Sequence, residues 1–179
     1  IPAILDRKHL LLCSPTGSGK TLTAFLTIID KLVRMALDGK LKKKVHCVYI
    51  SPIKALANDI QRNLIGPLTE ISERYLPDRA QEIKVGLRTG DTPQSERQRM
   101  LKHPPHILIT TPESLAIAIT SPKFQPIVSE LEYMIVDELH SLVPTKRGVH
   151  LGLTLSYLDT LLQTPVQRIG ISATMEPLE

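Results

Sequence analysis

The sequence predicts an α/β domain in which a mainly parallel sheet carries helices on both of its faces. Short apolar runs alternate along the chain with stretches of helical spacing, which is the order of a sheet built from crossover connections. Several of these runs are apolar at nearly every position, as expected of strands that are covered on both sides. The length of 179 residues and the hydrophobic content of 42% suit one domain over residues 1–179.

The strands and helices can be placed along the chain in order. Each strand is a short run of β-branched or other apolar residues, and each helix follows residues that favour a helix start. The predicted strands cover residues 9–13, 45–51, 83–87, 106–111, 133–138 and 168–172. The predicted helices begin near Lys20, Ala55, Pro93, Pro112 and Val149. Gly and Pro mark turns in this order, and no internal repeat or low-complexity tract indicates a domain boundary.

Composition and charge narrow the class of protein. The formal net charge of +4 favours polyanionic partners. The densest basic run, residues 40–44, precedes a predicted strand, so we interpret it as a solvated loop, with a phosphate contact as the alternative. Cys13 and Cys47 both lie in apolar runs and are expected to be buried, reduced thiols. No apolar stretch approaches the roughly 18 residues of a membrane span, so a cytoplasmic protein without a membrane partner is expected.

The stretch SPTGSGKT, residues 14–21, lies between the first predicted strand and the following helix. In a parallel sheet this is the carboxyl end of a strand, where ligands bind. Glycines allow the backbone there to wrap a polyphosphate, and the helix start adds its positive dipole end. Lys20 is expected to reach the phosphates of ATP, and the Thr21 hydroxyl to coordinate Mg²⁺. The other predicted nucleotide-binding residues are Thr16, Gly17, Ser18 and Gly19.

The stretch VDELH indicates hydrolysis rather than nucleotide binding alone. A predicted buried strand ends in two adjacent carboxylates, Asp137 and Glu138. Asp137 is expected to hold Mg²⁺, and Glu138 to orient and deprotonate the attacking water. Lys20, Asp137 and Glu138 are therefore the predicted catalytic residues. This interpretation requires Gly19 and Asp137 to lie at the same edge of the folded sheet.

The chain resembles the first motor domain of superfamily-two helicases, because SPTGSGKT, SPIKALAND, TTPESL, VDELH and ISAT occur in that family's order. Longer phrases, among them SPIKALANDIQRNL, RTGDTPQSERQRML and DELHSLVPTKRGVHL, are similar to the large helicase-related proteins of bacteria and archaea. The similarity runs through almost the whole chain. It implies a RecA-like P-loop NTPase fold and an ATP-dependent helicase that hydrolyses ATP with Mg²⁺.

In this family ATP lies between two RecA-like lobes, and the chain resembles the first lobe only. The resemblance implies a second lobe in the same longer chain, which supplies the arginine fingers, and low activity of the first lobe alone. The start at Ile1, without methionine, also leads us to expect a piece of a longer protein. The implied partner is nucleic acid, with single-stranded DNA favoured, a 3′-to-5′ direction and a DNA-repair context. An RNA helicase and a nucleotide-dependent remodelling module without a nucleic-acid track are the alternatives.

The resemblance assigns nucleic-acid contacts to segments that follow three of the predicted strands. These residues are Pro52 and Lys54, Thr89 and Gly90, and Thr111 and Pro112. The chemistry agrees, because turns and helix starts present backbone N–H groups to phosphates. Since aromatic residues make up only 3% of the chain, contacts to phosphate and sugar are expected rather than base stacking.

Each of these segments also has an architectural interpretation. The SPIKALAND segment would start a helix in any case. Asp91 with Gln94 fits a helix cap, and Thr110 with Glu113 fits a capping box with Pro112 in the first turn. Because a capped helix start can also hold a phosphate, the two interpretations are compatible.

Coupling between nucleotide and nucleic acid is assigned, again by resemblance, to His140, Ser172 and Thr174. These residues follow neighbouring strand ends, where hydrogen bonds link the state of the γ-phosphate to lobe movement. A purely structural role is the alternative for His140. Lys146 and Arg147 follow in a predicted loop, and for them a functional contact and a solvated charge are equally open.

Overall fold

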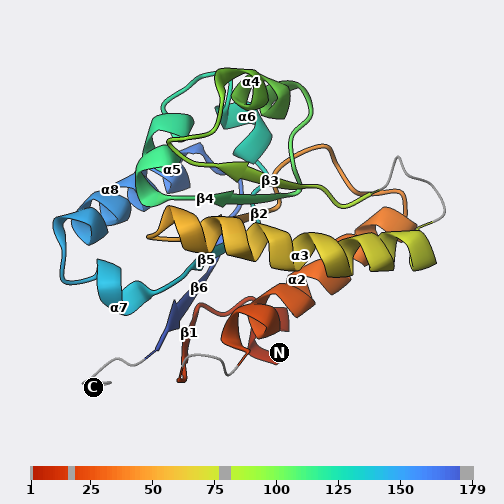
Figure 1. Ribbon diagram of the computed structural model, residues 1–179, viewed down its shortest axis with the longest axis horizontal. Helices are drawn as coiled ribbons and strands as arrows, with labels where there is room; N and C mark the ends of the chain where they lie inside the picture. The colour runs from red at the N-terminus through yellow and green to blue at the C-terminus, as the bar shows by residue number, and fades with distance from the viewer. Residues whose placement is uncertain (1, 16–18, 77–81, 174–179) are drawn as a thin grey trace.

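Figure 1 shows the computed structural model, which describes residues 2–15, 19–76 and 82–173. Within these residues six parallel strands form one sheet in the order β1-β6-β5-β2-β4-β3. The strands are β1 (Leu10–Cys13), β2 (Cys47–Ile50), β3 (Val85–Arg88), β4 (Ile107–Thr110), β5 (Tyr133–Val136) and β6 (Gln167–Ser172). The helices are α1 (Pro2–Leu5), α2 (Lys20–Leu37), α3 (Lys54–Tyr75), α4 (Gln94–Lys102), α5 (Pro112–Ile119), α6 (Gln125–Val128), α7 (Leu139–Leu142) and α8 (Lys146–Leu161).

The burial of each strand follows its place in the sheet. Strands β2, β4 and β5 are buried at every position, as their nearly uniformly apolar sequences predict. Strands β1 and β3 lie at the two edges and alternate in burial. The predicted parallel sheet is therefore confirmed, with its most apolar strands in the interior.

Two hydrophobic clusters fill the space on the two sides of the sheet. Since successive side chains of a strand point to opposite faces, Tyr49 joins one cluster and Ile50 the other. Helices α1, α2 and α3 cover the first face, and α4 to α8 cover the second (Figure 1). None of the described helices combines the length and the apolar character that crossing a membrane requires.

The predicted elements agree closely with the observed ones. All six strands are present, and the starts of α2, α3, α4 and α5 lie within one residue of the expected positions. Helix α8 begins at Lys146, three residues before the expected start, because Thr145 caps it. The four-residue helices α1, α6 and α7 escape sequence prediction, since a single turn carries no periodic pattern.

The expectation that both cysteines are buried is wrong for Cys13. Its strand β1 lies at the sheet edge and alternates between half-buried and exposed positions, and Cys13 falls on the exposed side. Cys47 lies in the interior strand β2 and is fully buried. Burial raises the pKa of the Cys47 thiol, which keeps this sulfur neutral.

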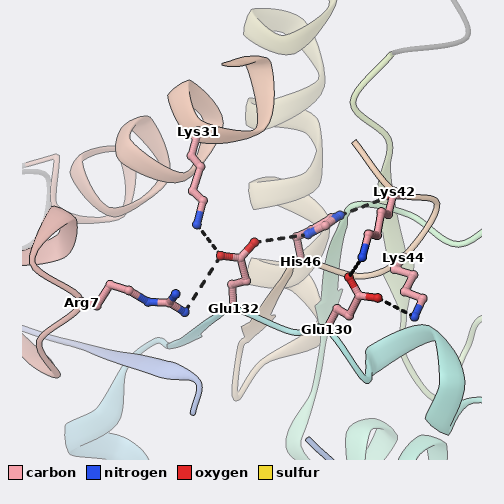
Figure 2. Close-up of polar contacts among 7 residues, drawn as sticks. All are labelled: Arg7, Lys31, Lys42, Lys44, His46, Glu130 and Glu132. Carbon is pink, nitrogen blue, oxygen red and sulfur yellow. Dashed lines mark hydrogen bonds and ion pairs between the residues drawn. The ribbon is translucent and has the colours of Figure 1, made fainter. Parts of the chain in front are cut away.

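The amino-terminal edge of the sheet is held by charged residues around Glu132, which directly precedes β5 (Figure 2). The Glu132 carboxylate pairs with Lys31 of α2 and lies 4.0 Å from Arg7 Nη2. The His46 Nδ1 atom lies 3.5 Å from the same carboxylate. The contacts with His46 first and then with Lys31 lower the pKa of Glu132 to about 2, against the opposing effect of burial. The carboxylate therefore joins α2, the turn after α1 and the start of β2.

The basic run at residues 40–44 is a loop, as expected, but most of its lysines are ion-paired. Glu130 lies 2.6 Å from the Lys42 Nζ atom and 2.9 Å from the Lys44 Nζ atom (Figure 2). Lys40 pairs with Asp38 at 3.3 Å. These carboxylates offset much of the positive charge that composition alone assigns to the run.

Candidate functional site

The predicted nucleotide loop and the acidic strand end lie at the same edge of the sheet. Strands β1, β6 and β5 are parallel neighbours, so the loop after Cys13 and the acids after Val136 both leave the carboxyl edge. The requirement that Gly19 and Asp137 share one edge is met. Three predicted residues of the loop lie outside the described residues: Thr16, Gly17 and Ser18.

The end of the loop presents a helix start and a cation. Gly19 has a φ of +80°, in the left-handed region that favours glycine. It is the N-cap residue of α2, and no described side chain caps the helix with a hydrogen bond. The Lys20 ammonium donates to the carbonyl oxygens of Ser14 and Pro15, the latter at 2.7 Å. An uncapped helix start beside an ammonium group suits an anion.

Tyr49 of β2 connects helix α2 with the acidic strand end. Its ring stacks on Phe25 with 5.3 Å between centroids, and its phenol donates to the Asp137 carboxylate. Thr21 lies one helical turn before Phe25, on the same side of α2. Burial is the main cause that raises the pKa of Tyr49, and Asp137 adds to it, whereas hydrogen bonding with Thr21 lowers it. Thr21 thus lies close enough to the phenol to affect its pKa, and Asp137 accepts the hydrogen bond of that phenol.

Asp137 and Glu138 are adjacent in sequence but point differently. Asp137 is only 4% exposed, and its Oδ1 accepts the backbone N–H of Glu138 at 2.9 Å. Glu138 has a φ of 48°, which is uncommon for a residue with a side chain. This left-handed residue turns the chain into α7, and the two carboxylates have different partners, Tyr49 for Asp137 and His140 for Glu138.

His140 links the Glu138 carboxylate to Ser172 at the end of β6. The His140 Nε2 atom lies 3.2 Å from the Glu138 carboxylate, and its Nδ1 lies 3.1 Å from the Ser172 hydroxyl. Because the backbone N–H of Ala173 also donates to Nδ1, the neutral ring carries its hydrogen on Nε2, facing Glu138. Two of the three predicted coupling residues thus touch, and Thr174 lies outside the described residues.

The predicted nucleic-acid residues lie along the other half of the same edge, after the neighbouring strands β2, β4 and β3. Lys54 opens α3, and its Nζ lies 2.7 Å from Asp91 Oδ1 in the turn after β3. The ammonium expected at a phosphate is thus paired with a carboxylate. Lys54 and Gly90 are the exposed members of the predicted set. The buried members are Pro52, Thr89, Thr111 and Pro112.

The turn after β3 is braced by helix α4. The Arg97 Nη2 atom donates to the carbonyl oxygens of Thr89 at 3.2 Å and Gly90 at 2.9 Å. The Thr92 hydroxyl accepts the backbone N–H of Thr89 at 2.8 Å. Since the Thr89 side chain is buried, this turn offers mainly its backbone to a ligand.

The helix caps expected in two segments are wrong in detail. Asp91 does not cap α4, because its carboxylate pairs with Lys54 and the N-cap residue is Pro93. Helix α5 is capped by Thr111, whose Oγ1 accepts the backbone N–H of Ser114.

The capping box proposed for α5 assigned the cap to Thr110. This residue ends β4, and its buried hydroxyl donates to the Arg88 carbonyl oxygen at 2.7 Å. Pro112 occupies the first turn as predicted. The cap is therefore displaced by one residue towards the helix.

Sequence reasoning missed Tyr49, which appears in the sequence as one more apolar residue of a buried strand. The alternation of strand side chains carries a signal for it. Tyr49 lies opposite Ile135, so its side chain shares a face with Asp137, two residues later. A polar-tipped aromatic beside a buried acid is expected to donate to it.

Comparisons with known proteins find similar helicases. A model of the DEAD/DEAH box helicase family matches residues 1–179. The ATP-dependent helicase Lhr-Core of Methanothermobacter thermautotrophicus is 56% identical over 181 residues, covering 99% of this chain and 21% of that protein. The protein of the same name from Methanocaldococcus jannaschii is 52% identical over 180 residues, also covering 99% of this chain and 21% of that protein.

A solved structure is similar over the same length. The Mycobacterium smegmatis helicase Lhr bound to ssDNA and AMP-PNP matches with a TM-score of 0.87 and 46% identity. The match covers 98% of this chain and 22% of that chain. The chain thus spans about a fifth of the length of the curated relatives it matches.

Proposed function

Because the chain belongs to the DEAD/DEAH box helicase family, we propose that it is the ATP-binding lobe of a longer ATP-dependent nucleic-acid helicase. The similarity to the solved Lhr helicase confirms the RecA-like fold that the sequence predicts. The second RecA-like lobe, which would close over the nucleotide, belongs to the proposal. It is supported by relatives about five times as long as this chain.

One observation carries the proposal: Thr21 of the nucleotide loop and Asp137 of the acidic strand end lie at the same carboxyl edge of the sheet, where the phenol of Tyr49 donates to Asp137. These residues come from segments more than a hundred positions apart in the sequence. Their meeting at one edge provides a cation, an uncapped helix start and a buried carboxylate in a single place.

The described residues fit ATP with Mg²⁺. Lys20 and the start of α2 suit the phosphates, with backbone N–H groups of residues 16–19 as further donors in the proposal. The Thr21 hydroxyl and the Asp137 carboxylate are oxygen ligands of the kind that Mg²⁺ prefers. Bound Mg²⁺ would supply charge neutralisation at the phosphates.

Glu138 is the proposed acceptor of the proton of the attacking water. Its carboxylate is oriented by His140, which in turn contacts Ser172 at the end of β6. A displacement of the segment at residues 172–173 would turn the imidazole and with it the Glu138 carboxylate. This path is the proposed coupling between lobe movement and hydrolysis, with Thr174 as its continuation.

The proposed track is single-stranded DNA, which the similar Mycobacterium smegmatis helicase holds in its structure. Backbone groups and Lys54 would contact phosphate and sugar, because the described edge offers no row of aromatic side chains for stacking. A 3′-to-5′ direction and a DNA-repair context, which rest on the family resemblance, complete the proposal together with the cytoplasmic setting expected from the sequence.

ATP hydrolysis by the full-length protein, measured with and without single-stranded DNA and RNA, tests this function. We expect turnover that rises on addition of DNA and falls with increasing salt. ATP turnover that rises with RNA but not with DNA would show that the protein moves on RNA instead of DNA. Turnover that neither nucleic acid changes would indicate a remodelling module and overturn the helicase proposal.

A further inference from the structure

Arg147 occupies a position that is fixed by the fold. It lies in the first turn of α8, after the N-cap residue Thr145. The Thr145 hydroxyl accepts the backbone N–H of Gly148 at 3.3 Å and donates to the Leu142 carbonyl oxygen at 2.7 Å. A Cβ at Gly148 would overlap that same carbonyl oxygen, so glycine is needed for this close approach. The start of α8 is thereby anchored to the end of α7.

From this anchored turn, one guanidinium group joins two of the candidate nucleic-acid segments. The Arg147 Nη2 atom donates to the Pro52 carbonyl oxygen at 2.8 Å, in the segment between β2 and α3. Its Nε lies 2.6 Å from Glu113 Oε1, and Nη2 lies 3.3 Å from Oε2, in the first turn of α5. Strands β2 and β4, which precede these segments, are neighbours in the sheet.

The ion pair between Arg147 and Glu113 is also seen in the pKa of Glu113. Hydrogen bonding from Arg147 is the main cause that lowers the pKa of the Glu113 carboxyl. The two side chains are 45% and 51% exposed, so the ion pair alone contributes little to the stability of the fold. Its geometry is nevertheless specific, because a planar guanidinium can engage a carboxylate and a carbonyl together, whereas a lysine ammonium is a point charge.

We infer that Arg147 is a positioning residue for nucleic-acid binding. It sets the spacing between the Pro52 segment and the start of α5, and its effect on the track is indirect. This inference rests on the proposed function, since both segments are candidate contacts with the nucleic-acid backbone. It resolves the two interpretations left open by the sequence: the charge of Arg147 serves an internal bridge, while the neighbouring Lys146 is exposed and makes no ion pair among the described residues.

The test is the affinity of the full-length protein for a single-stranded oligothymidylate at several salt concentrations, with a non-hydrolysable ATP analogue present. We expect Arg147→Met to weaken binding about tenfold, the effect of one charged hydrogen bond. Glu113→Gln should cause a similar loss, and the double variant should be no worse than either single variant. Affinity for the ATP analogue should stay unchanged, which shows that the variants are folded.

Salt dependence separates positioning from direct contact. The slope of log affinity against log salt should be the same for Arg147→Met and the wild type, because the number of phosphates contacted does not change. A slope reduced by about 0.7, the value for one phosphate contact with a single strand, would overturn the positioning role. Lys146→Met is the matched control and should leave both affinity and slope unchanged.

The variants also distinguish this inference from the proposed function. Unchanged affinity in both Arg147→Met and Glu113→Gln, with normal wild-type binding, would overturn the inference alone. A wild-type protein that binds neither single-stranded DNA nor RNA would overturn the proposed function and, with it, this role. An affinity of Arg147→Lys for the oligothymidylate that lies between those of Arg147→Met and the wild type would support the need for the two-pronged guanidinium donor.

Discussion

The phenol of Tyr49 donates a hydrogen bond to the carboxylate of Asp137 across two neighbouring strands. The other oxygen of that carboxylate accepts the backbone N–H of Glu138. A buried acid is thus held at both oxygens, and each oxygen retains a further lone pair for a cation. The ring that supplies the donor is itself fixed by stacking on Phe25 of α2. Helix α2 therefore helps to orient the acid through the ring of Tyr49.

Replacing Tyr49 with Phe should loosen the acidic strand end while preserving the core. The variant keeps the ring and its stacking but leaves one oxygen of a buried carboxylate without its donor, at a cost of about 1–3 kcal/mol. Hydrogen exchange of β2 and β5 amides in the full-length protein should accelerate accordingly, and hydrolysis should need more Mg²⁺. Phe25→Leu is the control for lost stacking without a lost donor. Unchanged exchange and Mg²⁺ dependence in Tyr49→Phe would show that the bond does not orient Asp137.

Lys20→Ala should weaken ATP binding by at least about tenfold, because it removes a charged donor from the phosphate position. Equilibrium binding of a fluorescent ATP analogue to the full-length protein measures the effect. Lys31→Ala, which removes a lysine of the same helix at the opposite sheet edge, is the control and should bind ATP normally. Equal affinities in Lys20→Ala and the wild type would refute the phosphate role.

Glu138→Gln should bind ATP normally and hydrolyse it about 10²–10⁴ times more slowly, the range for removal of a general base. The amide retains the size of the side chain and a hydrogen-bonding oxygen but cannot take up a proton. Single-turnover hydrolysis, together with analogue affinity, separates the chemical step from binding. Normal turnover would assign the base to another residue.

His140→Ala should reduce the stimulation of hydrolysis by single-stranded DNA several-fold relative to the unstimulated rate. The imidazole is the link between Glu138 and Ser172, so its removal disconnects the acid from β6. The ratio of stimulated to unstimulated turnover is the relevant measurement. His150→Ala, on the exposed side of α8, provides a comparison. If the two variants keep the same ratio as the wild type, His140 has a structural role only.

Glu132→Gln should remove part of the acid sensitivity of the fold. The folded-state pKa of Glu132 is about 2, below its ordinary value of 4.5. The contribution of Glu132 to the free energy of unfolding is therefore fully present above pH 4.5 and is lost as the pH falls from about 4.5 to about 2. A depression of this size corresponds to about 3 kcal/mol. Hydrogen exchange of β5 and α2 amides should show the variant less protected at neutral pH and less dependent on pH in this window.

The buried His106 also makes the stability of the fold depend on pH, but over a higher pH range than Glu132 does. Burial is the main cause that lowers the pKa of His106 from 6.5 to about 4. The fold therefore favours the neutral imidazole, and this contribution to the free energy of unfolding is lost as the pH falls from 6.5 to about 4. That loss should appear in both the wild type and Glu132→Gln. Asp30→Asn, which breaks an exposed ion pair with Arg34, should leave protection unchanged at any pH. An acid profile of Glu132→Gln identical to that of the wild type would contradict the role of the carboxylate.

Sequence patterns predicted the sheet and brought the segments of the candidate site to one edge because their signals are local. The apolar runs located all six strands, and the residues around Gly19 and Asp137 follow parallel strands whose carboxyl ends must share an edge. Positions that depend on neighbours were harder. Cys13 is exposed only because β1 lies at an edge, and edge position is a property of strand order.

The remaining differences concern side chains that have more than one possible partner. Asp91 fits a helix cap in sequence, but folding places Lys54 beside it, and the ion pair replaces the cap. Arg147 gives no sequence signal that distinguishes a solvated charge from a bridge, since both of its partners lie more than thirty residues away. Long-range pairings of this kind follow from topology rather than from spacing.

The distance between the carboxyl ends and the amino ends of the strands also matters for redesign of this domain. Residues that would meet ligands leave the carboxyl ends of the strands, whereas Glu130 and Glu132 join chain segments at the opposite ends. Loops at the first edge can therefore be exchanged or grafted without disturbing the charged anchors at the second. A chimaera that received new loops between β2 and α3 and between β4 and α5 would keep its strand register, provided that an arginine–glutamate bridge is transplanted with them.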